Sequence, residues 1–434
     1  MNTRYRSTRA AAEQPGIELG AALAAGLADD GGLYVPAELP NIAAIDPALG
    51  LPAVAEHWLR PFFADSTLAS ALPQLCAQAL DLPLPRVNIG DQGDQVLELF
   101  HGPTAAFKDF GARFLAACLA ALRAPDEPTR TILVATSGDT GAAVAGAFHR
   151  LPGFRVLILY PDGRVSARQA HQLGAFGDNV HCYRVDGSFD DCQRMVKQAF
   201  RDEALRERCS ITSANSISLG RLLPQATYYA HACAAHSAET GADCNLIIPT
   251  GNLGNALAAM LVRACGGPID RIVLASNANR VLPDLFAQQR YQGRPSVATL
   301  ANAMDVGDPS NYERLAWLYP GDSLFSAGIE AEAVDDQQIR QRIVRCYQDF
   351  GYVACPHTAC ALELLARKRE RGDGHRWLIA ATAHPAKFET VVEPLLEHGV
   401  PPPPALAALL AKPSHADPLP ADYAALRAQL IAIS

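Results

Sequence analysis

The chain has 434 residues, of which 49% are hydrophobic and 19% are charged, and its formal net charge is -8 at pH 7. This length allows a large buried core and two or three domains. The negative balance and the lack of any basic run exclude a nucleic-acid-binding surface, because phosphate backbones require concentrated Lys and Arg.

No stretch reaches the roughly 18 consecutive apolar residues of a membrane helix. Residues 1–9 are polar and no apolar segment follows them, which predicts no secretory signal. The 11 cysteines show neither C-x-x-C pairing nor zinc-ligand spacing, and their odd number disfavours a complete disulfide framework. We therefore expect reduced thiols, no metal site, no membrane partner and a cytoplasmic location.

Residues 1–82 predict a first unit in which no chemistry is visible. Residues 17–27 have helical spacing, and residues 54–82 predict two helices with Pro61 and Pro73 near their starts. A packing or lid unit is the interpretation that this region supports.

Short apolar runs alternate with helical patterns from residue 83 to about residue 400. The expected strands are 95–100, 131–135, 154–160, 179–185, 245–249, 271–276 and 377–381. The expected helices are 111–124, 142–148, 165–173, 189–207, 222–236, 256–264, 337–347, 359–369 and 388–397. Such alternation predicts an α/β protein with parallel sheets and right-handed crossovers. Residues 401–404 include a run of prolines that precedes a C-terminal tail.

The segment from His101 to Gly111 places Lys108 between Phe107 and Phe110. Apolar neighbours desolvate an amine, which lowers its pKa and makes it a nucleophile able to form a Schiff base. Taken alone, Lys108 would be an ordinary surface lysine on a helix that packs on its other face. Three downstream loops at strand ends favour a chemical role instead.

The first of these loops is Thr250–Asn255, which lies between an expected strand and an expected helix. Gly251 and Gly254 would let an anion approach backbone N–H groups at the helix N-terminus. The loop lacks both the Gly-Lys-Ser/Thr of a P-loop and the third glycine of a dinucleotide fingerprint. It therefore predicts a cup for a single phosphate, although a tight packing turn would explain the loop equally well in isolation.

The second loop is Thr136–Gly141, in which Ser137 and Thr140 add hydroxyl donors to those of the backbone. This composition suits a carboxylate or a phosphate. The alternative is a helix cap, because Ser, Asp and Thr all cap helices well.

The third segment follows the strand 377–381, where Thr382 would direct a neutral hydroxyl at whatever occupies the strand ends. His384, which precedes Pro385, is interpreted as structural. A reactive lysine, a monophosphate cup and a carboxylate cup at strand ends are the parts needed to hold pyridoxal phosphate with an amino acid.

At these segments the chain resembles threonine synthase of the long type found in bacteria and fungi, within the tryptophan-synthase-β group of pyridoxal phosphate enzymes. The matching segments are 31–36, 101–109, 136–141, 215–221, 249–255, 302–307 and 382–388. The resemblance implies the fold type II architecture, with two parallel-sheet α/β domains and an added N-terminal helical unit. The expected division is an N-terminal unit over 1–82, a catalytic core over 83–400 whose smaller subdomain spans roughly 105–215, and a tail over 401–434.

The resemblance also implies the conversion of O-phospho-L-homoserine and water to L-threonine and phosphate. Lys108 would carry the cofactor and move protons, Asp139 would stand near the cofactor's 3'-hydroxyl, and Thr382 would face its ring nitrogen. The residues implied for the cofactor phosphate are Gly251, Asn252, Leu253, Gly254 and Asn255. Those implied for the substrate are Ser137 and Thr140 at its carboxylate, and Asn215, Ser216 and Arg221 at its phosphate, with Arg221 as the bidentate partner.

Two other functions remain open at this stage. A threonine or serine dehydratase of the same fold group would normally have a run of glycines in its phosphate loop, unlike Thr250–Asn255, and would not need Arg221. A catalytically silent homologue that binds pyridoxal phosphate or a metabolite would not need Lys108, Arg221 and Thr382 together. The sequence predicts a monomer or a weak homodimer with a small-molecule substrate.

Overall fold

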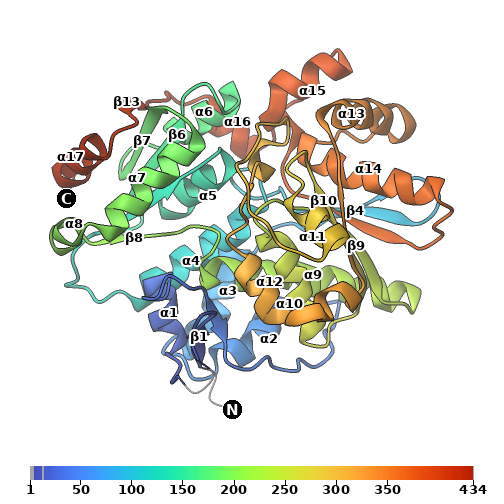
Figure 1. Cartoon of the computed structure of the whole chain (residues 1–434), viewed down its shortest axis with the longest axis horizontal. Helices are drawn as coiled ribbons and strands as arrows, with labels where there is room; N and C mark the ends of the chain where they lie inside the picture. Colours follow the sequence, from blue (N-terminus) through green and yellow to red (C-terminus); the bar gives the residue numbers. More distant parts are fainter. Residues whose placement is uncertain (1–3, 12–13, 434) are drawn as a thin grey trace.

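Two β-sheets, each covered by helices, organise the computed structural model, which describes residues 4–11 and 14–433 (Figure 1). An antiparallel pair, β1 (Tyr5–Ser7) with β2 (Tyr34–Pro36), lies in the N-terminal part of the chain. Among the described residues, none of the helices combines the length and the apolar character that a membrane span requires.

In the described part of the chain the larger sheet has six strands. In spatial order they are β11 (Ile329–Ala333), β10 (Ile269–Ser276), β9 (Cys244–Pro249), β12 (Trp377–Ala381), β4 (Asp94–Glu98) and β3 (Arg86–Ile89). All neighbours run parallel except β3 and β4, which form an antiparallel pair. Every residue of β9 and β12 is buried, as expected for central strands covered on both faces.

Alternation along β9 supplies both faces of this sheet with core residues. Leu246 and Ile248 belong to one apolar cluster and Ile247 to another, because successive side chains of a strand point in opposite directions. The first cluster contains helices α9 (Leu219–Thr240), α10 (Gly254–Ala264) and α11 (Val281–Gln288). The second contains α13 (Asp336–Phe350), α14 (Pro356–Glu370) and α15 (Glu389–Leu396).

The smaller sheet is parallel throughout and has five strands within the described residues. In spatial order they are β13 (Asp417–Pro420), β7 (Val180–Asp186), β6 (Phe154–Pro161), β5 (Arg130–Ala135) and β8 (Ile211–Thr212). One face carries α4 (Lys108–Leu122), α5 (Asp139–Phe148) and α6 (Ala167–Gly174). The other face carries α7 (Phe189–Arg201), α8 (Glu203–Arg208) and α17 (Tyr423–Ile433).

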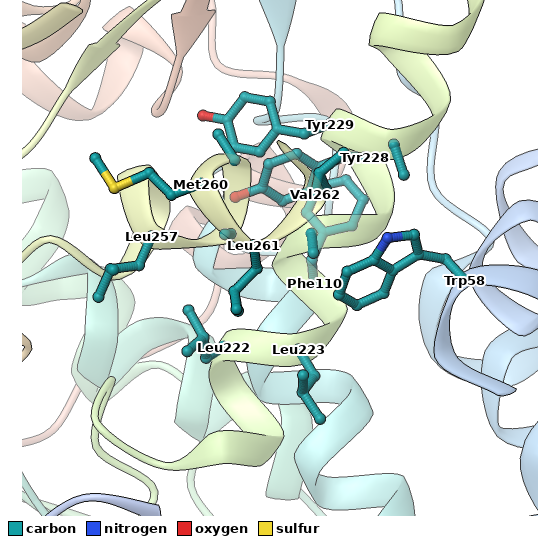
Figure 2. Packing of buried hydrophobic residues seen from close by; sticks show 14 of the residues in the cluster. Trp58, Phe110, Leu222, Leu223, Tyr228, Tyr229, Leu257, Met260, Leu261 and Val262 are labelled. Carbon is teal, nitrogen blue, oxygen red and sulfur yellow. The ribbon is translucent and has the colours of Figure 1, made fainter. Parts of the chain in front are cut away.

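The N-terminal part contributes α1 (Leu19–Ala25), α2 (Leu51–Phe63) and α3 (Leu72–Leu80), which pack on the core rather than apart from it. Figure 2 shows Trp58 of α2 directed toward Phe110 of α4 and Tyr228 of α9. The rings of Phe110 and Tyr228 meet edge to face, with centroids 5.0 Å apart. This part of the chain is therefore joined to the core through a shared apolar cluster.

Two expectations about helices differ from the structure. Pro61 lies in the last turn of α2, not near a start, and burial of Trp58 and Phe62 outweighs the hydrogen bond that this proline removes. The expected helix 189–207 is divided at Asp202, whose carboxylate accepts a hydrogen bond from the Leu205 N–H and caps α8.

The C-terminal residues also form regular structure that the sequence reading left unassigned. They contain α16 (Pro404–Leu410), the edge strand β13 and α17, and β13 pairs in parallel with β7. Elsewhere α12 (Tyr312–Leu318) and short 3-10 turns at 69–71, 302–304, 321–326 and 385–388 complete the described elements. The proposed boundaries at residues 82 and 400 remain predictions.

Candidate active site

One cavity of about 440 Å³ lies where the carboxyl ends of β5, β9 and β12 meet, so both sheets contribute to it. Parallel sheets bind ligands at this edge, because the strands lead there into helix N-termini. The sequence-predicted residues that line it are Lys108, Ser137, Asp139, Thr140, Asn215, Ser216, Arg221, Gly251, Asn252, Leu253, Gly254, Asn255 and Thr382. The structure therefore brings all the sequence-predicted site residues together, while their individual roles remain predictions.

Lys108 is the first residue of α4, and the end of β12 holds the segment that precedes it. The Phe107 N–H donates to the Thr382 carbonyl over 2.8 Å, and the His384 N–H donates to the Ala105 carbonyl over 3.0 Å. These bonds join the lysine segment to the segment that contains Thr382. They fix the position of Lys108 relative to the sheet ends.

Burial lowers the pKa of the Lys108 amine to about 8, with Arg221 and Lys387 acting in the same direction and Asp139 opposing them. An amine with this pKa has a far larger neutral fraction at neutral pH than an ordinary lysine. It can therefore act as a nucleophile and as a base.

The loop before α5 is shaped by its own backbone. The Thr136 hydroxyl accepts hydrogen bonds from the N–H groups of Gly138 (3.0 Å) and Gly141 (2.8 Å). Gly138 has φ +129°, a conformation that L residues rarely adopt, and it is also the residue at the helix cap position. Within the described part of the chain, the hydroxyls of Ser137 and Thr140 make no hydrogen bond to another residue and line the cavity. The helix cap expected as the alternative is present in part: the cap position itself is Gly138, which has no side chain, but the Thr136 hydroxyl accepts the N–H of Gly141, the third residue of α5.

The loop before α10 is tighter still. Leu253 occupies the left-handed region at φ +65°, and a side chain at Gly251 would meet the Met304 backbone at 2.7 Å. Gly254, at the first turn of α10, has no neighbour closer than 3.8 Å to the position of an added Cβ. The loop is thus closed on the side of Gly251 and open at Gly254, which fits an anion placed at the helix N-terminus.

Asn255 supplies a buried donor beside this loop. Its side-chain oxygen accepts hydrogen bonds from the hydroxyls of Tyr228 (2.6 Å) and Tyr229 (3.0 Å), whose rings appear in Figure 2. Its Nδ2 is buried and has no partner among the described residues. Because both tyrosines donate to the oxygen, the amide nitrogen is oriented away from them and is available to a ligand oxygen.

Arg221 lies on α9 and is fully buried. Its Nη1 donates to the Ala214 carbonyl over 2.7 Å, while Nε and Nη2 have no partner among residues 4–11 and 14–433. Burial lowers the pKa of this guanidinium to about 10, with Asp109 opposing the shift, so it remains charged at neutral pH. A buried cation with two unpartnered nitrogens at a cavity wall requires an anionic ligand.

Asp139 is held by a lysine that the sequence reading did not select as a site residue. Its Oδ1 lies 2.7 Å from the Nζ of Lys387 and 3.1 Å from the Nε2 of Gln169. Burial alone would raise the pKa of Asp139, but the positive charges of Lys387 and Lys108 keep it well below its usual value. Lys387 also donates to the Thr104 carbonyl over 2.8 Å.

His357 and Asn302 line the cavity as well, and neither was predicted as a site residue. Burial lowers the pKa of His357 to about 4, so its ring is neutral, and its Nε2 accepts from the Ala303 N–H over 3.1 Å. Lys387 lies in segment 382–388 and Asn302 in segment 302–307, both of which carry the family resemblance. The place of Asn302 in the cavity lining and the contact of Lys387 with Asp139 depend on tertiary packing, which no local pattern reports. His357 had no sequence signal.

Three protein-family models match the chain. They are a pyridoxal-phosphate-dependent enzyme model over residues 96–382, a threonine synthase N-terminus model over 4–80 and a threonine synthase C-terminal model over 358–430. The threonine synthase of Serratia marcescens is 38% identical over 96% of this chain and 97% of its own length. The chain belongs to the threonine synthase family.

Solved structures agree with this assignment. Threonine synthase from Escherichia coli superposes with a TM-score of 0.90 at 35% identity, over 99% of this chain and 100% of that one. The threonine synthase from Brucella melitensis with bound pyridoxal phosphate also gives 0.90, at 30% identity, over 100% and 99% of the two chains. The fold type II architecture and the pyridoxal phosphate cofactor expected from the sequence are therefore confirmed, and the chain is a pyridoxal-phosphate-dependent lyase.

The residues of this chain fit the cofactor. The Lys108 amine has a lowered pKa, the Thr250–Asn255 loop is open at Gly254, and the Asn255 Nδ2 lacks a partner among the described residues. These features match an aldehyde to be bound by an amine and a phosphate to be bound by a helix N-terminus.

Proposed function

We propose that this chain converts O-phospho-L-homoserine and water to L-threonine and phosphate. The observation that carries the proposal is Arg221, a buried arginine with two unpartnered nitrogens, Nε and Nη2, at the wall of the cavity that contains Lys108. A reaction that expels phosphate needs a fixed positive charge where the leaving group develops its own negative charge. A dehydratase, which releases ammonia from an unphosphorylated amino acid, has no such need.

Pyridoxal phosphate, when bound, withdraws electrons from the carbons next to the substrate amine and so makes their protons removable. In this proposal the Lys108 amine accepts and returns those protons, since its pKa of about 8 lies close to neutral pH. Backbone N–H groups of the Thr250–Asn255 loop and the Asn255 Nδ2 hold the cofactor phosphate. Asp139, kept ionised by Lys387, would lie near the cofactor's 3'-hydroxyl.

The substrate is held at both of its charged ends in this proposal. The hydroxyls of Ser137 and Thr140 bind its carboxylate at the N-terminal end of α5, where the helix dipole favours an anion. Asn215, Ser216 and Arg221 bind its phosphate, and the free Nε and Nη2 of Arg221 have the fork geometry for two phosphate oxygens. The reacting carbons lie between these two anchors, which places them for proton transfer by Lys108.

Thr382 is inferred to be a neutral partner for the cofactor's ring nitrogen, since it ends β12 at the cavity and is itself buried. A carboxylate there would fix a proton on that nitrogen. The ring would then withdraw electrons mainly from the α-carbon, which does not favour the chemistry at the β- and γ-carbons that the proposed reaction requires. Thr382→Asp is expected to lower kcat at least about tenfold, which corresponds to about 1.4 kcal/mol. Thr382→Ser keeps the hydroxyl and should retain most activity; a normally active Thr382→Asp enzyme would contradict this role.

The decisive experiment measures phosphate release from O-phospho-L-homoserine and identifies the organic product in the same reaction. Threonine in equal amount to phosphate, abolished by Lys108→Ala, is the expected result. Phosphate with 2-oxobutanoate would indicate a dehydratase-like outcome. An enzyme that binds the cofactor but releases no phosphate would refute the proposed substrate.

We also infer a cytoplasmic location and a monomer or weak homodimer. Each of the 11 cysteines is a buried free thiol in this structure, which supports a reducing compartment. Cell fractionation tests the location, and sedimentation of the purified protein over a range of concentrations tests the oligomeric state.

A further inference from the structure

Arg314, on α12, is an almost completely buried arginine that lies outside the cavity. It is 2% exposed, and it forms no ion pair with any residue that the structure describes. Its Nε and Nη2 donate to the Tyr34 carbonyl over 3.2 and 2.9 Å, and its Nη1 donates to the Asn311 Oδ1 over 2.9 Å. Tyr34 belongs to β2, so this guanidinium joins the N-terminal part of the chain to α12.

Asn311 continues the connection to the cavity. It is fully buried, and its Nδ2 donates to the Asn252 carbonyl over 2.9 Å. The Asn252 side chain is held as well, because its Oδ1 accepts from the Ser310 N–H over 2.8 Å and its Nδ2 donates to the Ser216 hydroxyl over 3.0 Å. A chain of hydrogen bonds therefore runs from Tyr34 through Arg314 and Asn311 to the Thr250–Asn255 loop.

Arg314, which belongs to this series of hydrogen bonds, carries a charge that is unusual for a buried side chain. Burial lowers the pKa of Arg314 to about 9, against a smaller opposing effect of Glu313, and leaves the guanidinium protonated at neutral pH. A buried cation without a carboxylate partner is costly unless an anion lies nearby. The hydrogen bonds that it makes lead toward the loop proposed to receive a phosphate.

We propose that Arg314 is a positioning residue for the cofactor phosphate: through Asn311 it holds the Thr250–Asn255 loop in its anion-binding shape and makes that loop depend on the N-terminal strand β2. The proposal assigns a task to residues 1–82, for which the sequence indicated a packing or lid unit without visible chemistry. It rests on the proposed function in one respect, namely that this loop binds the cofactor phosphate.

A matched control lies next to Arg314 in the sequence. Glu313 also links α12 to the N-terminal residues, through an ion pair with Arg9 and a hydrogen bond of 2.8 Å from the Thr8 hydroxyl. This second link is partly exposed and does not lead to the loop. Glu313→Gln therefore weakens the docking of residues 8–9 on α12 and leaves every hydrogen bond from Tyr34 through Arg314 and Asn311 in place.

The test compares two ligands that differ only in the phosphate. Apo forms of the wild type, Arg314→Met, Arg314→Lys, Asn311→Ala and Glu313→Gln are titrated with pyridoxal phosphate and with pyridoxal, and binding is followed by absorbance. Loss of a hydrogen bond that involves a charged group weakens binding roughly 10-fold or more. Arg314→Met and Asn311→Ala should bind pyridoxal phosphate about 10-fold more weakly than the wild type does. Their affinity for pyridoxal should change less than about twofold, which is within the scatter of such measurements.

Arg314→Lys keeps the charge and should recover part of the affinity, while Glu313→Gln should match the wild type for both ligands. Equal weakening for pyridoxal phosphate and pyridoxal in Arg314→Met and Asn311→Ala would overturn the proposal, because it would mean a general structural role. Unchanged affinities would overturn it too. If Arg314→Met fails to fold, the ligand affinities of Asn311→Ala decide whether the proposal holds, since this variant leaves the hydrogen bonds between Arg314 and Tyr34 in place. A wild type without preference for pyridoxal phosphate would instead refute the phosphate loop itself, and this proposal with it.

Discussion

Burial sets the chemistry of Lys108, and the pH dependence of cofactor attachment follows from it. The pKa of this amine falls from the ordinary value of 10.5 to about 8, so the neutral, nucleophilic form increases as the pH rises through 8. We expect the rate at which apo-protein takes up pyridoxal phosphate to increase between pH 7 and about 8.5 and then to level off. Stopped-flow absorbance over this range checks the prediction. A rate that keeps increasing up to pH 10 would show an ordinary lysine.

The pair of Asp139 and Lys387 is the second place where burial determines the behaviour of single residues. Lys387→Met removes the cation and leaves a buried carboxylate without its charged partner, at an expected cost of about 3–5 kcal/mol in the free energy of unfolding. Because Lys387 keeps the pKa of Asp139 low, the pair's contribution is present above the ordinary pKa of a carboxyl, about 4, and is lost as the pH falls further.

Asp139→Asn combined with Lys387→Met removes both charges and is the control. The double variant should be more stable than Lys387→Met alone when both are unfolded in urea at pH 7. If the losses in the free energy of unfolding caused by Asp139→Asn and by Lys387→Met simply add in the double variant, the carboxylate and the amine contribute independently. That result would contradict the 2.7 Å contact between them.

At the scale of elements, the start of α5 depends on Gly138. Its φ of +129° is strained for any L residue, and an added Cβ would lie 2.6 Å from the Nε2 of Gln169, a buried side chain that also donates to Asp139. Gly138→Ala should therefore cost roughly 2–6 kcal/mol from backbone strain and overpacking together. Denaturant unfolding measures the loss.

Gly177→Ala provides the comparison for this substitution. Gly177 also has a positive φ, +68°, but no atom lies within 4 Å of its added Cβ. Only backbone strain applies there, at about 1–2 kcal/mol. Equal losses for the two variants would show that the contact with Gln169 has no effect.

The elements also show what a sequence can and cannot predict. The central strands β5, β9 and β12 are continuous apolar runs, and the loops that follow them contain the glycines and hydroxyls of the site, so both could be predicted from local pattern. Strand β13 could not, because it contains Pro418 and Pro420 and is a strand only through its pairing with β7. The burial of Lys387 was equally invisible, since it results from packing between segments far apart in sequence.

At the scale of the whole molecule, the two sheets and the N-terminal part contribute to the same cavity from different directions. The smaller sheet supplies the Thr136–Gly141 loop, the larger sheet supplies Thr250–Asn255 and Thr382, and β2 is linked to the Thr250–Asn255 loop through Arg314 and Asn311. The stability of each part therefore affects the site, even where the part contains no residue that lines it.

Residues 401–433 illustrate this dependence most directly, because they complete the smaller sheet and none of them lines the cavity. Leu426 and Leu430 of α17 are fully buried in the cluster that also contains Met195 of α7 and Leu205 of α8. Leu426→Ala should cost about 2–5 kcal/mol, since it leaves a cavity in a packed core. The exposed Leu49, at 42% exposure, is the matched control, and Leu49→Ala should cost less than about 0.5 kcal/mol. Because the Thr136–Gly141 loop follows β5 of the same sheet, we expect substrate binding to fall near the unfolding temperature of Leu426→Ala before cofactor binding at Thr250–Asn255 does. Thermal scans that follow bound cofactor and turnover in parallel test this order, and simultaneous loss of both would mean that the two sheets unfold as one unit.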